Sequence, residues 1–142
     1  MGWLSLGEVL DVHAKKHPKK LAVKDWFGKA CTYSELNTRT NRLANALLSM
    51  GLCKGDRVAV LLYNCAEFIE IYCAFAKAGL VVAPISWRYI DKEIEYVANH
   101  SDAKAMIIHE ELVKTIDSMR SRLERIDEDK YVVVSKSTPR SY

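Results

Sequence analysis

Apolar residues follow two patterns along this chain, one with the period of a helix and one typical of a strand. Short apolar runs predict four strands, at 57–63, 81–83, 105–108 and 131–134. Between these runs, apolar residues three and four positions apart predict helices over 65–78, 91–99 and 112–126. The run 57–63 is continuously apolar after Arg57, as in a strand covered on both faces of a parallel sheet. The alternation therefore predicts a parallel α/β sheet with right-handed crossovers.

Two helices are expected before this core, and both begin with the same signal. Ser5 with Glu8, and Thr32 with Glu35, have the spacing of a capping box, in which two side chains satisfy free backbone amides of the first turn. The first helix is expected to end before Pro18, because the residue preceding a proline avoids the helical region. We therefore expect one helix from about 5 to 17 and another that begins near 32.

A short hairpin is expected between the two helices. Strands at 21–26 and 29–31 flank Phe27-Gly28, which we interpret as a tight glycine turn. Gly51 follows the last apolar residue of the second helix and is expected to end it.

The core elements also carry boundary signals. Asn64, with Glu67 three residues later, is expected to cap the helix over 65–78. Gly79 is expected to end that helix, and Pro84 to end the strand that follows, because proline donates no hydrogen bond to a sheet. Asp91 is expected to cap the next helix.

These elements predict one domain with three parts. The parts are a helix-hairpin-helix preface at 1–51, a βαβαβαβ core at 52–135 and a frayed tail at 136–142. We expect a doubly wound sheet of flavodoxin-like strand order with flanking helices. No internal repeat and no low-complexity tract occurs in the sequence.

Composition narrows the function classes. The chain is 49% hydrophobic and 27% charged, as in globular proteins. A net charge of +3 from 21 basic and 18 acidic residues is too small to indicate nucleic acid as a partner. No apolar run approaches the ~20 residues of a membrane span, and the first residues do not have the pattern of a secretory signal. Four cysteines without a C-x-x-C pair and four scattered histidines predict reduced thiols, no metal site and a cytoplasmic location.

Candidate chemistry is sparse. None of the six glycines forms G-x-G-x-x-G or G-x-x-x-x-G-K-[ST], so the chain has no recognisable phosphate loop. The carboxylate pairs Glu67/Glu70 and Glu93/Glu95 are better explained by first-turn carboxylates that favour the helix dipole. His109, at a strand end, is expected to be solvated.

Trp87 and Arg88 are the more specific candidates for a ligand-binding site. They follow the second core strand, and ligands of open α/β sheets bind beyond the carboxyl ends of the strands. An indole beside a guanidinium suits stacking on a base or binding of a phosphate. A packed loop tryptophan beside a surface arginine is the more common arrangement.

Several segments resemble the adenylate-forming (AMP-binding) enzymes, which include the acyl-CoA synthetases. The segment Cys31-Thr32-Tyr33-Ser34-Glu35-Leu36 resembles the Thr-Tyr-x-Glu-Leu motif of that family. Further segments resemble family motifs in the same order, namely 41–44, 55–58, 64–68, 77–85 and 93–96. The resemblance covers nearly all of the chain and is closest to the fatty-acid–CoA ligases.

The resemblance implies a parent enzyme of which this chain is the N-terminal part of the large domain. Such a ligase uses ATP and magnesium to convert a carboxylic acid into an acyl-adenylate, and then transfers the acyl group to coenzyme A. A fatty acid is the carboxylic acid that the resemblance favours. The family's phosphate loop and catalytic lysine have no matching positions here, so no catalytic residue is assigned, and the chain alone is expected to be inactive and to bind no cofactor.

One residue role follows from the resemblance. Arg88 matches an arginine that contacts a phosphate of coenzyme A in some acyl-CoA ligases. Ser86 and Ile90 depart from the Asn and Thr that the family often has there.

Two other hypotheses compete with this one. The first is a stand-alone flavodoxin-like module that binds a nucleotide or flavin; the missing phosphate loop counts against this hypothesis. The other is an interaction or scaffold module. Because a partial domain exposes apolar surface and strand edges, we also expect self-association, with a dimer as the simplest form.

Overall fold

The computed structural model describes residues 4–26 and 28–135. The chain divides into two compact units. Unit 1 comprises Met1–Asp56 and Asn64–Val82, and unit 2 comprises Arg57–Tyr63 and Ala83–Tyr142.

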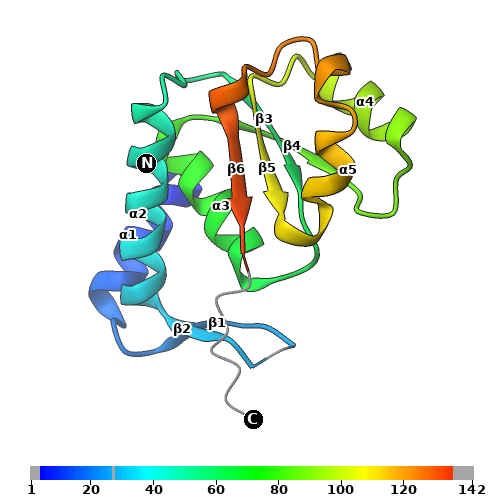
Figure 1. The fold of residues 1–142 in the computed structure, drawn as a ribbon. Helices are drawn as coiled ribbons and strands as arrows, with labels where there is room; N and C mark the ends of the chain where they lie inside the picture. Colours follow the sequence, from blue (N-terminus) through cyan, green and yellow to red (C-terminus); the bar gives the residue numbers. More distant parts are fainter. Residues whose placement is uncertain (1–3, 27, 136–142) are drawn as a thin grey trace. The chain divides into compact units, whose positions relative to one another are not determined.

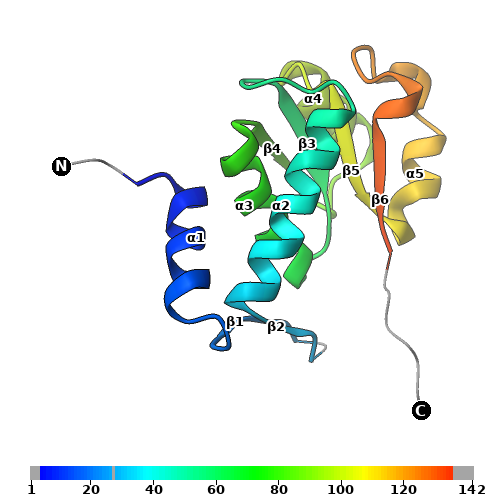
Figure 2. The same ribbon diagram turned by 90° about the vertical axis from the view of Figure 1, so that its left-hand side faces the viewer.

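The described residues of unit 1 form three helices and a hairpin, whose arrangement is seen in Figures 1 and 2. Its helices are α1 (Leu6–Lys16), α2 (Tyr33–Ser49) and α3 (Ala66–Ala78). Its two strands, β1 (Leu21–Lys24) and β2 (Ala30–Thr32), pair antiparallel. Leu10 of α1, Leu36 of α2 and Cys73 of α3 form a buried cluster, against which residues of the hairpin pack. The amphipathic faces expected from the sequence are therefore turned towards one another.

Both predicted capping boxes are present. The Ser5 hydroxyl accepts a hydrogen bond from the Glu8 amide at 3.3 Å, and the Glu8 carboxylate accepts one from the Ser5 amide at 2.7 Å. Thr32 and Glu35 make the same pair of bonds at 3.3 and 2.8 Å. Helix α1 ends at Lys16, before the proline as predicted. After α2 the chain turns at Gly51, which has a φ of +87°. This confirms the prediction that Gly51 ends the second helix.

The hairpin strands are placed slightly differently from the prediction. Strand β1 ends at Lys24, where 21–26 was predicted, and β2 lies one residue later than 29–31. The chain already turns at Asp25, whose amide donates to the Lys29 carbonyl and whose carboxylate accepts from the Lys29 amide, both at 2.8 Å. The predicted turn includes Phe27, which lies outside the described residues.

The predicted cap of α3 is wrong. The residue at the N-cap is Cys65, which makes no side-chain cap bond, and Asn64 lies one position further out. The Glu67 carboxylate makes no capping bond to Asn64; it pairs with the Lys29 ammonium of the hairpin and interacts with the Cys65 side chain at the start of the helix. At the other end Gly79 is left-handed, with φ of 72°, and ends the helix as predicted.

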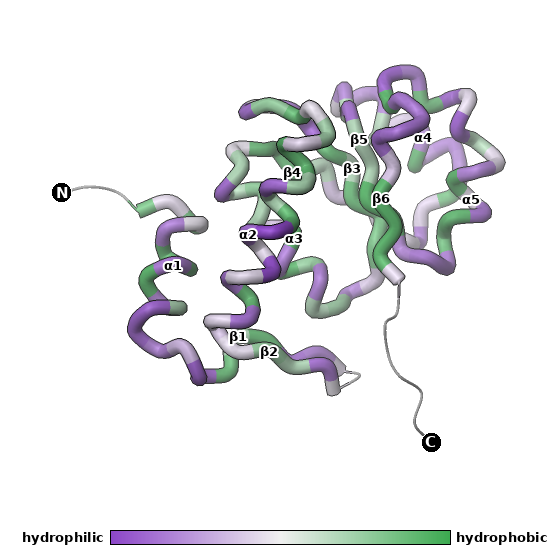
Figure 3. The backbone as a smooth tube through the Cα atoms, turned by 60° about the vertical axis from the view of Figure 1, so that its left-hand side comes forward, coloured by the Kyte–Doolittle hydropathy of each residue, from purple (hydrophilic) through white to green (hydrophobic). Residues whose placement is uncertain are grey.

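The four core strands form one sheet in the order β4-β3-β5-β6. They are β3 (Arg57–Leu61), β4 (Val81–Ile85), β5 (Ala105–His109) and β6 (Tyr131–Val134). Strand β5 pairs parallel with both β3 and β6. Counted from the first core strand, the order is 2-1-3-4, which is the predicted flavodoxin-like arrangement. Hydrophobic colour follows β3, β5 and β6 in Figure 3.

Strand β3 is buried on both faces. Ala59 and Leu61 point into the main apolar cluster of unit 2, which includes Ile94 and Ala98 of helix α4 (Asp91–His100). Their neighbours Val58 and Val60 are also fully buried. The continuous apolar run in the sequence reflects this burial on both sides. The strand itself ends at Leu61, two residues earlier than predicted.

Pro84 does not end its strand, contrary to the prediction. Strand β4 continues through it to Ile85. β4 is the edge strand of the sheet, and on an edge a residue without an N–H costs no ladder bond when that position faces outwards.

The predicted cap of α4 is also wrong by one residue. Ile90 occupies the N-cap and Asp91 is the first helical residue. The Glu93 carboxylate accepts a hydrogen bond from the Ile90 amide at 2.9 Å, and so supplies half of a capping box without a hydroxyl partner.

The single helix predicted over 112–126 is broken into short pieces. A 3-10 turn (η1, Glu110–Leu112) leads into α5 (Val113–Asp117), and a second 3-10 turn follows (η2, Arg120–Arg122). Of the five apolar positions in the pattern, Leu112 is partly buried, and the other four are buried: Ile116, Met119, Leu123 and Ile126. Their spacing of three and four fits successive 3-10 and α turns as well as one continuous helix. A third 3-10 turn (η3, Glu128–Lys130) precedes β6.

Candidate functional site

Three aromatic residues gather at the carboxyl ends of the parallel strands in unit 2. Tyr63 lies two residues beyond β3, Trp87 two residues beyond β4, and His109 is the last residue of β5. The Tyr63 ring contacts the Trp87 ring edge-to-face, with centroids 5.2 Å apart, and the His109 ring at 4.7 Å. Parallel strands bring such residues to one edge of the sheet, which is where ligands of open α/β folds bind.

Arg88 extends this cluster with a positive charge. Its guanidinium carbon lies 4.9 Å from the centroid of the Trp87 ring, within the range of a cation–π contact. A turn holds the pair, because the Tyr89 amide donates to the Ser86 carbonyl at 3.0 Å and the Arg88 amide donates to the Ser86 hydroxyl at 3.3 Å. Arg88 makes no ion pair within the described part of the chain, so its charge faces solvent uncompensated.

The two sides of the cluster differ in exposure. Trp87 is 42% exposed and Arg88 is exposed, whereas His109 is only 4% exposed. His109 is therefore not the solvated loop histidine that the sequence indicated. Its Nδ1 accepts a hydrogen bond from the Glu111 amide at 3.3 Å, which leaves Nε2 to carry the proton of a neutral ring. Tyr63 was missed from the sequence because it was counted as the last residue of a core strand.

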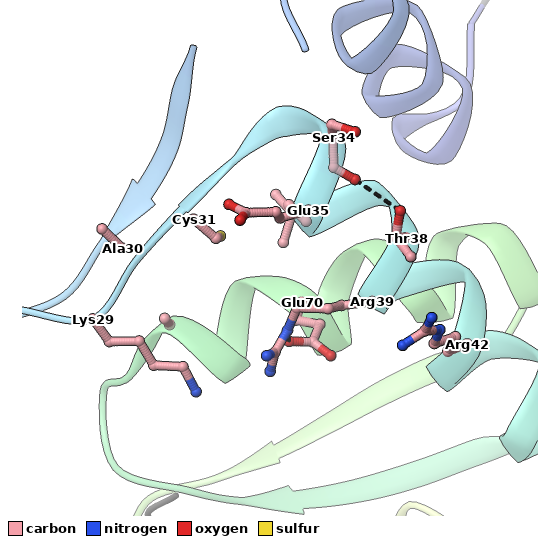
Figure 4. A pocket seen from close by; sticks show the side chains of 11 residues that line it. Lys29, Ala30, Cys31, Ser34, Glu35, Thr38, Arg39, Arg42 and Glu70 are labelled. Atoms are coloured by element: carbon pink, nitrogen blue, oxygen red, sulfur yellow. Dashed lines mark hydrogen bonds and ion pairs between the residues drawn. The ribbon is translucent and has the colours of Figure 1, made fainter. Parts of the chain in front are cut away.

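A hollow lies in unit 1, between the hairpin, α2 and α3 (Figure 4). Its volume is about 360 Å³. Five charged side chains line it, namely Lys29, Glu35, Arg39, Arg42 and Glu70. Two of these, Arg39 and Glu70, pair with each other at 2.7 Å, and this hydrogen bond raises the pKa of the Arg39 guanidinium.

The suggested carboxylate pair Glu67/Glu70 does not form an acid–base couple. Glu70 pairs with Arg39, and Glu67 pairs with Lys29. Burial works to raise the pKa of Glu67, but the hydrogen bond from Lys29 and local backbone bonds outweigh it and leave that pKa lowered. Both carboxylates therefore tie α3 to neighbouring elements as anions.

A second hollow, in unit 2, lies beside α4 and has a volume of about 630 Å³. Tyr96 and His100 stack along one side of it with ring centroids 5.1 Å apart. Arg122 lies nearby and pairs with Glu95 at 3.3 Å and Asp91 at 3.8 Å.

Residues 4–26 and 28–135 have three further properties that bear on function. No group of three or more His, Cys, Asp or Glu side chains lies close enough together to hold a metal ion. The four cysteines are free thiols. None of the described helices combines the length and apolar character required to cross a bilayer.

Comparison with known proteins gives a consistent set of relatives. The family model for AMP-binding enzymes matches residues 10–141. Long-chain-fatty-acid–CoA ligase FadD13 of Mycobacterium tuberculosis is 35% identical over 91 residues, which cover 64% of this chain and 18% of that protein. Crotonobetaine/carnitine–CoA ligase of Proteus mirabilis is 41% identical over 111 residues, which cover 75% of this chain and 21% of that protein.

Solved structures agree with these relatives. The N-terminal domain of FACL13 from Mycobacterium tuberculosis has a TM-score of 0.85 at 28% identity, over 93% of this chain and 34% of that one. A long-chain-fatty-acid CoA ligase from Rhodopseudomonas palustris, marked putative in its own description, has a TM-score of 0.86 at 26% identity, over 95% of this chain and 34% of that one. The chain spans between 18% and 24% of the length of the curated relatives that it matches.

Proposed function

The chain belongs to the AMP-binding enzyme family, the acyl-CoA and adenylate-forming ligases, and we propose that the protein carrying it joins a carboxylic acid to coenzyme A. The reaction has two steps: ATP and the acid give an acyl-adenylate with release of pyrophosphate, and the thiol of coenzyme A then displaces AMP. The match to the family over residues 10–141 is the observation that carries the proposal.

A fatty acid is the acid that we propose. FadD13 and a ligase of Thermus thermophilus, at 35% and 32% identity, are named long-chain-fatty-acid–CoA ligases. The crotonobetaine/carnitine–CoA ligase differs in its acid but shares the thiol acceptor. We further propose that the protein acts in the cytoplasm.

Arg88 is the residue that we propose for a phosphate of coenzyme A. Its guanidinium is exposed, stacks on Trp87 and has no acidic partner among the described residues, so it is free to form charge-assisted bonds to an anion. The half-exposed indole beside it offers a face on which a base can stack. Bound coenzyme A supplies the thiol nucleophile, and the role of this chain is to hold and orient one of its phosphates.

We assign no residue of the chain to ATP or magnesium. The sequence has no glycine-rich phosphate loop, and in the hollow of unit 1 (Figure 4) the Arg39 guanidinium is already paired with the Glu70 carboxylate. We therefore propose that the 142-residue chain alone is inactive.

Steady-state kinetics of Arg88→Ala in the intact protein test the role of Arg88. Loss of a hydrogen bond to a charged group costs about 1.5–3 kcal/mol, so we expect the KM for coenzyme A to rise about 10- to 100-fold. ATP–pyrophosphate exchange, which precedes coenzyme A binding, should keep its rate. Arg125→Ala is the matched control, because Arg125 is an exposed arginine of the same unit that pairs with Asp102 at 3.0 Å.

The two parts of the proposal fail separately. An unchanged KM for coenzyme A in Arg88→Ala would remove Arg88 from the site and leave the reaction class standing. Absence of fatty-acid-dependent ATP–pyrophosphate exchange by the intact protein would overturn the substrate class. Exchange catalysed by the 142-residue chain alone would show that it contains a nucleotide site after all.

A further inference from the structure

Three rings at the carboxyl ends of neighbouring strands form a continuous series that leads to Arg88. The strands lie in the spatial order β4-β3-β5, and Trp87, Tyr63 and His109 lie at their ends in that same order. Tyr63 is therefore the middle ring, with the Trp87 centroid at 5.2 Å and the His109 centroid at 4.7 Å. We call these three side chains the ring series.

The ring series is fixed at its inner end. His109 is 4% exposed, and its Nδ1 accepts a hydrogen bond from the Glu111 amide at the start of η1. The imidazole is thus bonded to the backbone and packed against the Tyr63 ring. A side chain that is both buried and hydrogen-bonded is held in one orientation, so the imidazole is a firm support for the phenol ring.

Exposure increases towards the outer end of the series. The Trp87 indole is half-buried, and the exposed Arg88 guanidinium lies over its ring at 4.9 Å. An arginine side chain in solvent has many rotamers, and contact with a ring favours a few of them. The indole in turn rests on Tyr63, so the orientation of the guanidinium depends on rings that lie behind it.

We propose that Tyr63 and His109 are positioning residues for coenzyme A. They hold Trp87, and through it the Arg88 guanidinium, in the orientation that receives a phosphate, and they act without touching the coenzyme. This inference rests on the role proposed above for Arg88. A guanidinium that is oriented beforehand loses less conformational entropy when the phosphate binds, so the rings contribute to affinity for coenzyme A.

A purely structural role for the two inner rings predicts a different outcome. Loss of the Tyr63 ring would then weaken the whole of unit 2, and the formation of acyl-adenylate and of thioester would suffer alike. Positioning predicts a defect confined to the binding of coenzyme A.

Steady-state kinetics of the intact protein distinguish these outcomes. Tyr63→Leu removes the middle ring and should raise the KM for coenzyme A about three- to tenfold, the factor that one aromatic pair contributes. ATP–pyrophosphate exchange and the kcat at saturating coenzyme A should keep their wild-type rates. Tyr63→Phe loses only the hydroxyl and should keep the KM within about twofold of the wild type.

His109→Asn provides a second variant at the inner end of the series. Asparagine keeps a hydrogen-bond acceptor for the Glu111 amide but removes the ring that supports Tyr63. It should raise the KM for coenzyme A as Tyr63→Leu does, again with normal ATP–pyrophosphate exchange. An equal loss of exchange and of thioester formation in both variants would overturn the proposal in favour of the structural role.

Combination with Arg88→Ala shows whether the rings act through the arginine. In that background Tyr63→Leu should raise the KM for coenzyme A by less than about a further twofold, because no guanidinium remains to be oriented. Full additivity of the two changes would overturn the proposal. Tyr96→Leu is the matched control, because Tyr96 is also a tyrosine of unit 2 that stacks on a histidine, His100, but it lies outside the ring series. It should leave the KM unchanged.

The emission of Trp87 provides a readout that does not involve coenzyme A. The 142-residue chain has three tryptophans, so Trp3→Phe/Trp26→Phe leaves Trp87 as its single indole. In that background Tyr63→Leu should lower the fluorescence anisotropy of Trp87 and increase its quenching by acrylamide, and Tyr63→Phe should change neither.

The two proposals fail separately in these measurements. Unchanged anisotropy and quenching in Tyr63→Leu would overturn the positioning role, even where Arg88→Ala raises the KM for coenzyme A. Lower anisotropy together with an unchanged KM in Arg88→Ala would instead overturn the role of Arg88, and with it the link between the ring series and coenzyme A.

Discussion

At the scale of single residues, Thr40 departs from the rules that govern most of the chain. It lies on α2 with a fully buried side chain, and its hydroxyl has no hydrogen-bond partner among the described residues. An unsatisfied buried hydroxyl costs free energy because it has lost its bonds to water.

Replacing this hydroxyl by a methyl group should stabilise the protein. We expect Thr40→Val to raise the free energy of unfolding by about 1 kcal/mol, as measured by urea denaturation. Thr40→Ser is the matched control, since it keeps the hydroxyl and loses the methyl group, and it should lower stability by about 1 kcal/mol. A destabilised Thr40→Val protein with a normal Thr40→Ser protein would mean that the hydroxyl has a partner.

At the scale of elements, Lys77 holds the three helices of unit 1 together. Its ammonium donates to Asp11 of α1 at 2.5 Å, and to Asn37 and Asn41 of α2 at 2.7 and 2.8 Å. The Lys77 side chain is only 12% exposed, so these bonds lie at the edge of the packed interior. One partly buried cation of α3 thus satisfies polar groups from two other helices.

This arrangement makes part of the stability pH-dependent. The hydrogen bond from Lys77 is the main cause that lowers the pKa of Asp11, against a smaller opposing effect of burial. A carboxyl with a lowered folded-state pKa contributes stability above its unfolded pKa of about 4, and this contribution is lost as the pH falls through the folded-state pKa. Asp11→Asn should therefore be more destabilising at neutral pH than in acid.

Urea denaturation between neutral pH and about pH 3 measures this effect. The gap between wild type and Asp11→Asn should shrink below about pH 5. In a Lys77→Met background the Asp11→Asn change should lose this pH dependence, because the partner is absent. A gap that stays constant in both backgrounds would contradict the link between the two residues.

The element scale also shows what the sequence could and could not predict. Both hydroxyl capping boxes were correct because their partners lie three residues apart and compete with nothing else. The cap of α3 was wrong because the helix begins one residue later, with Cys65 at the N-cap, and Glu67 pairs with Lys29, a partner 38 positions away that no local pattern reveals. Similarly, Pro84 is tolerated only because β4 is an edge strand, which is a property of the whole sheet.

Some residues of the candidate site could likewise be predicted from the sequence, and others could not. Trp87 and Arg88 could be singled out because they follow a strand of a parallel sheet. Tyr63 and the burial of His109 could not, because their contact at 4.7 Å depends on how far β3 and β5 extend. Within 112–126 the sequence identified the buried positions but not the break of the helix, since their spacing fits both turn types.

At the scale of the whole molecule, unpaired strand edges and exposed apolar residues favour association. Strands β4 and β6 form the two edges of the sheet, and Val133 on β6 is 48% exposed. An open edge is a template for pairing with a second chain.

We therefore propose that the 142-residue chain self-associates, with a dimer as the simplest form. Sedimentation velocity over rising concentration should show a species heavier than the 16.1 kDa monomer. Val133→Lys places a charge on the β6 edge and should shift the equilibrium towards monomer. Thr115→Lys, a charge added away from the edges, is the control. A strictly monomeric profile of the wild type at high concentration would contradict the proposal.

The route of the backbone through the two units has a further consequence. The segment 57–63 of unit 2 is inserted between two stretches of unit 1. A break in the polypeptide anywhere from 57 to 82 therefore separates residues of both units at once. Neither unit corresponds to one continuous stretch of the sequence. Exchanging either unit for that of another protein therefore requires new connections at three junctions, 56/57, 63/64 and 82/83.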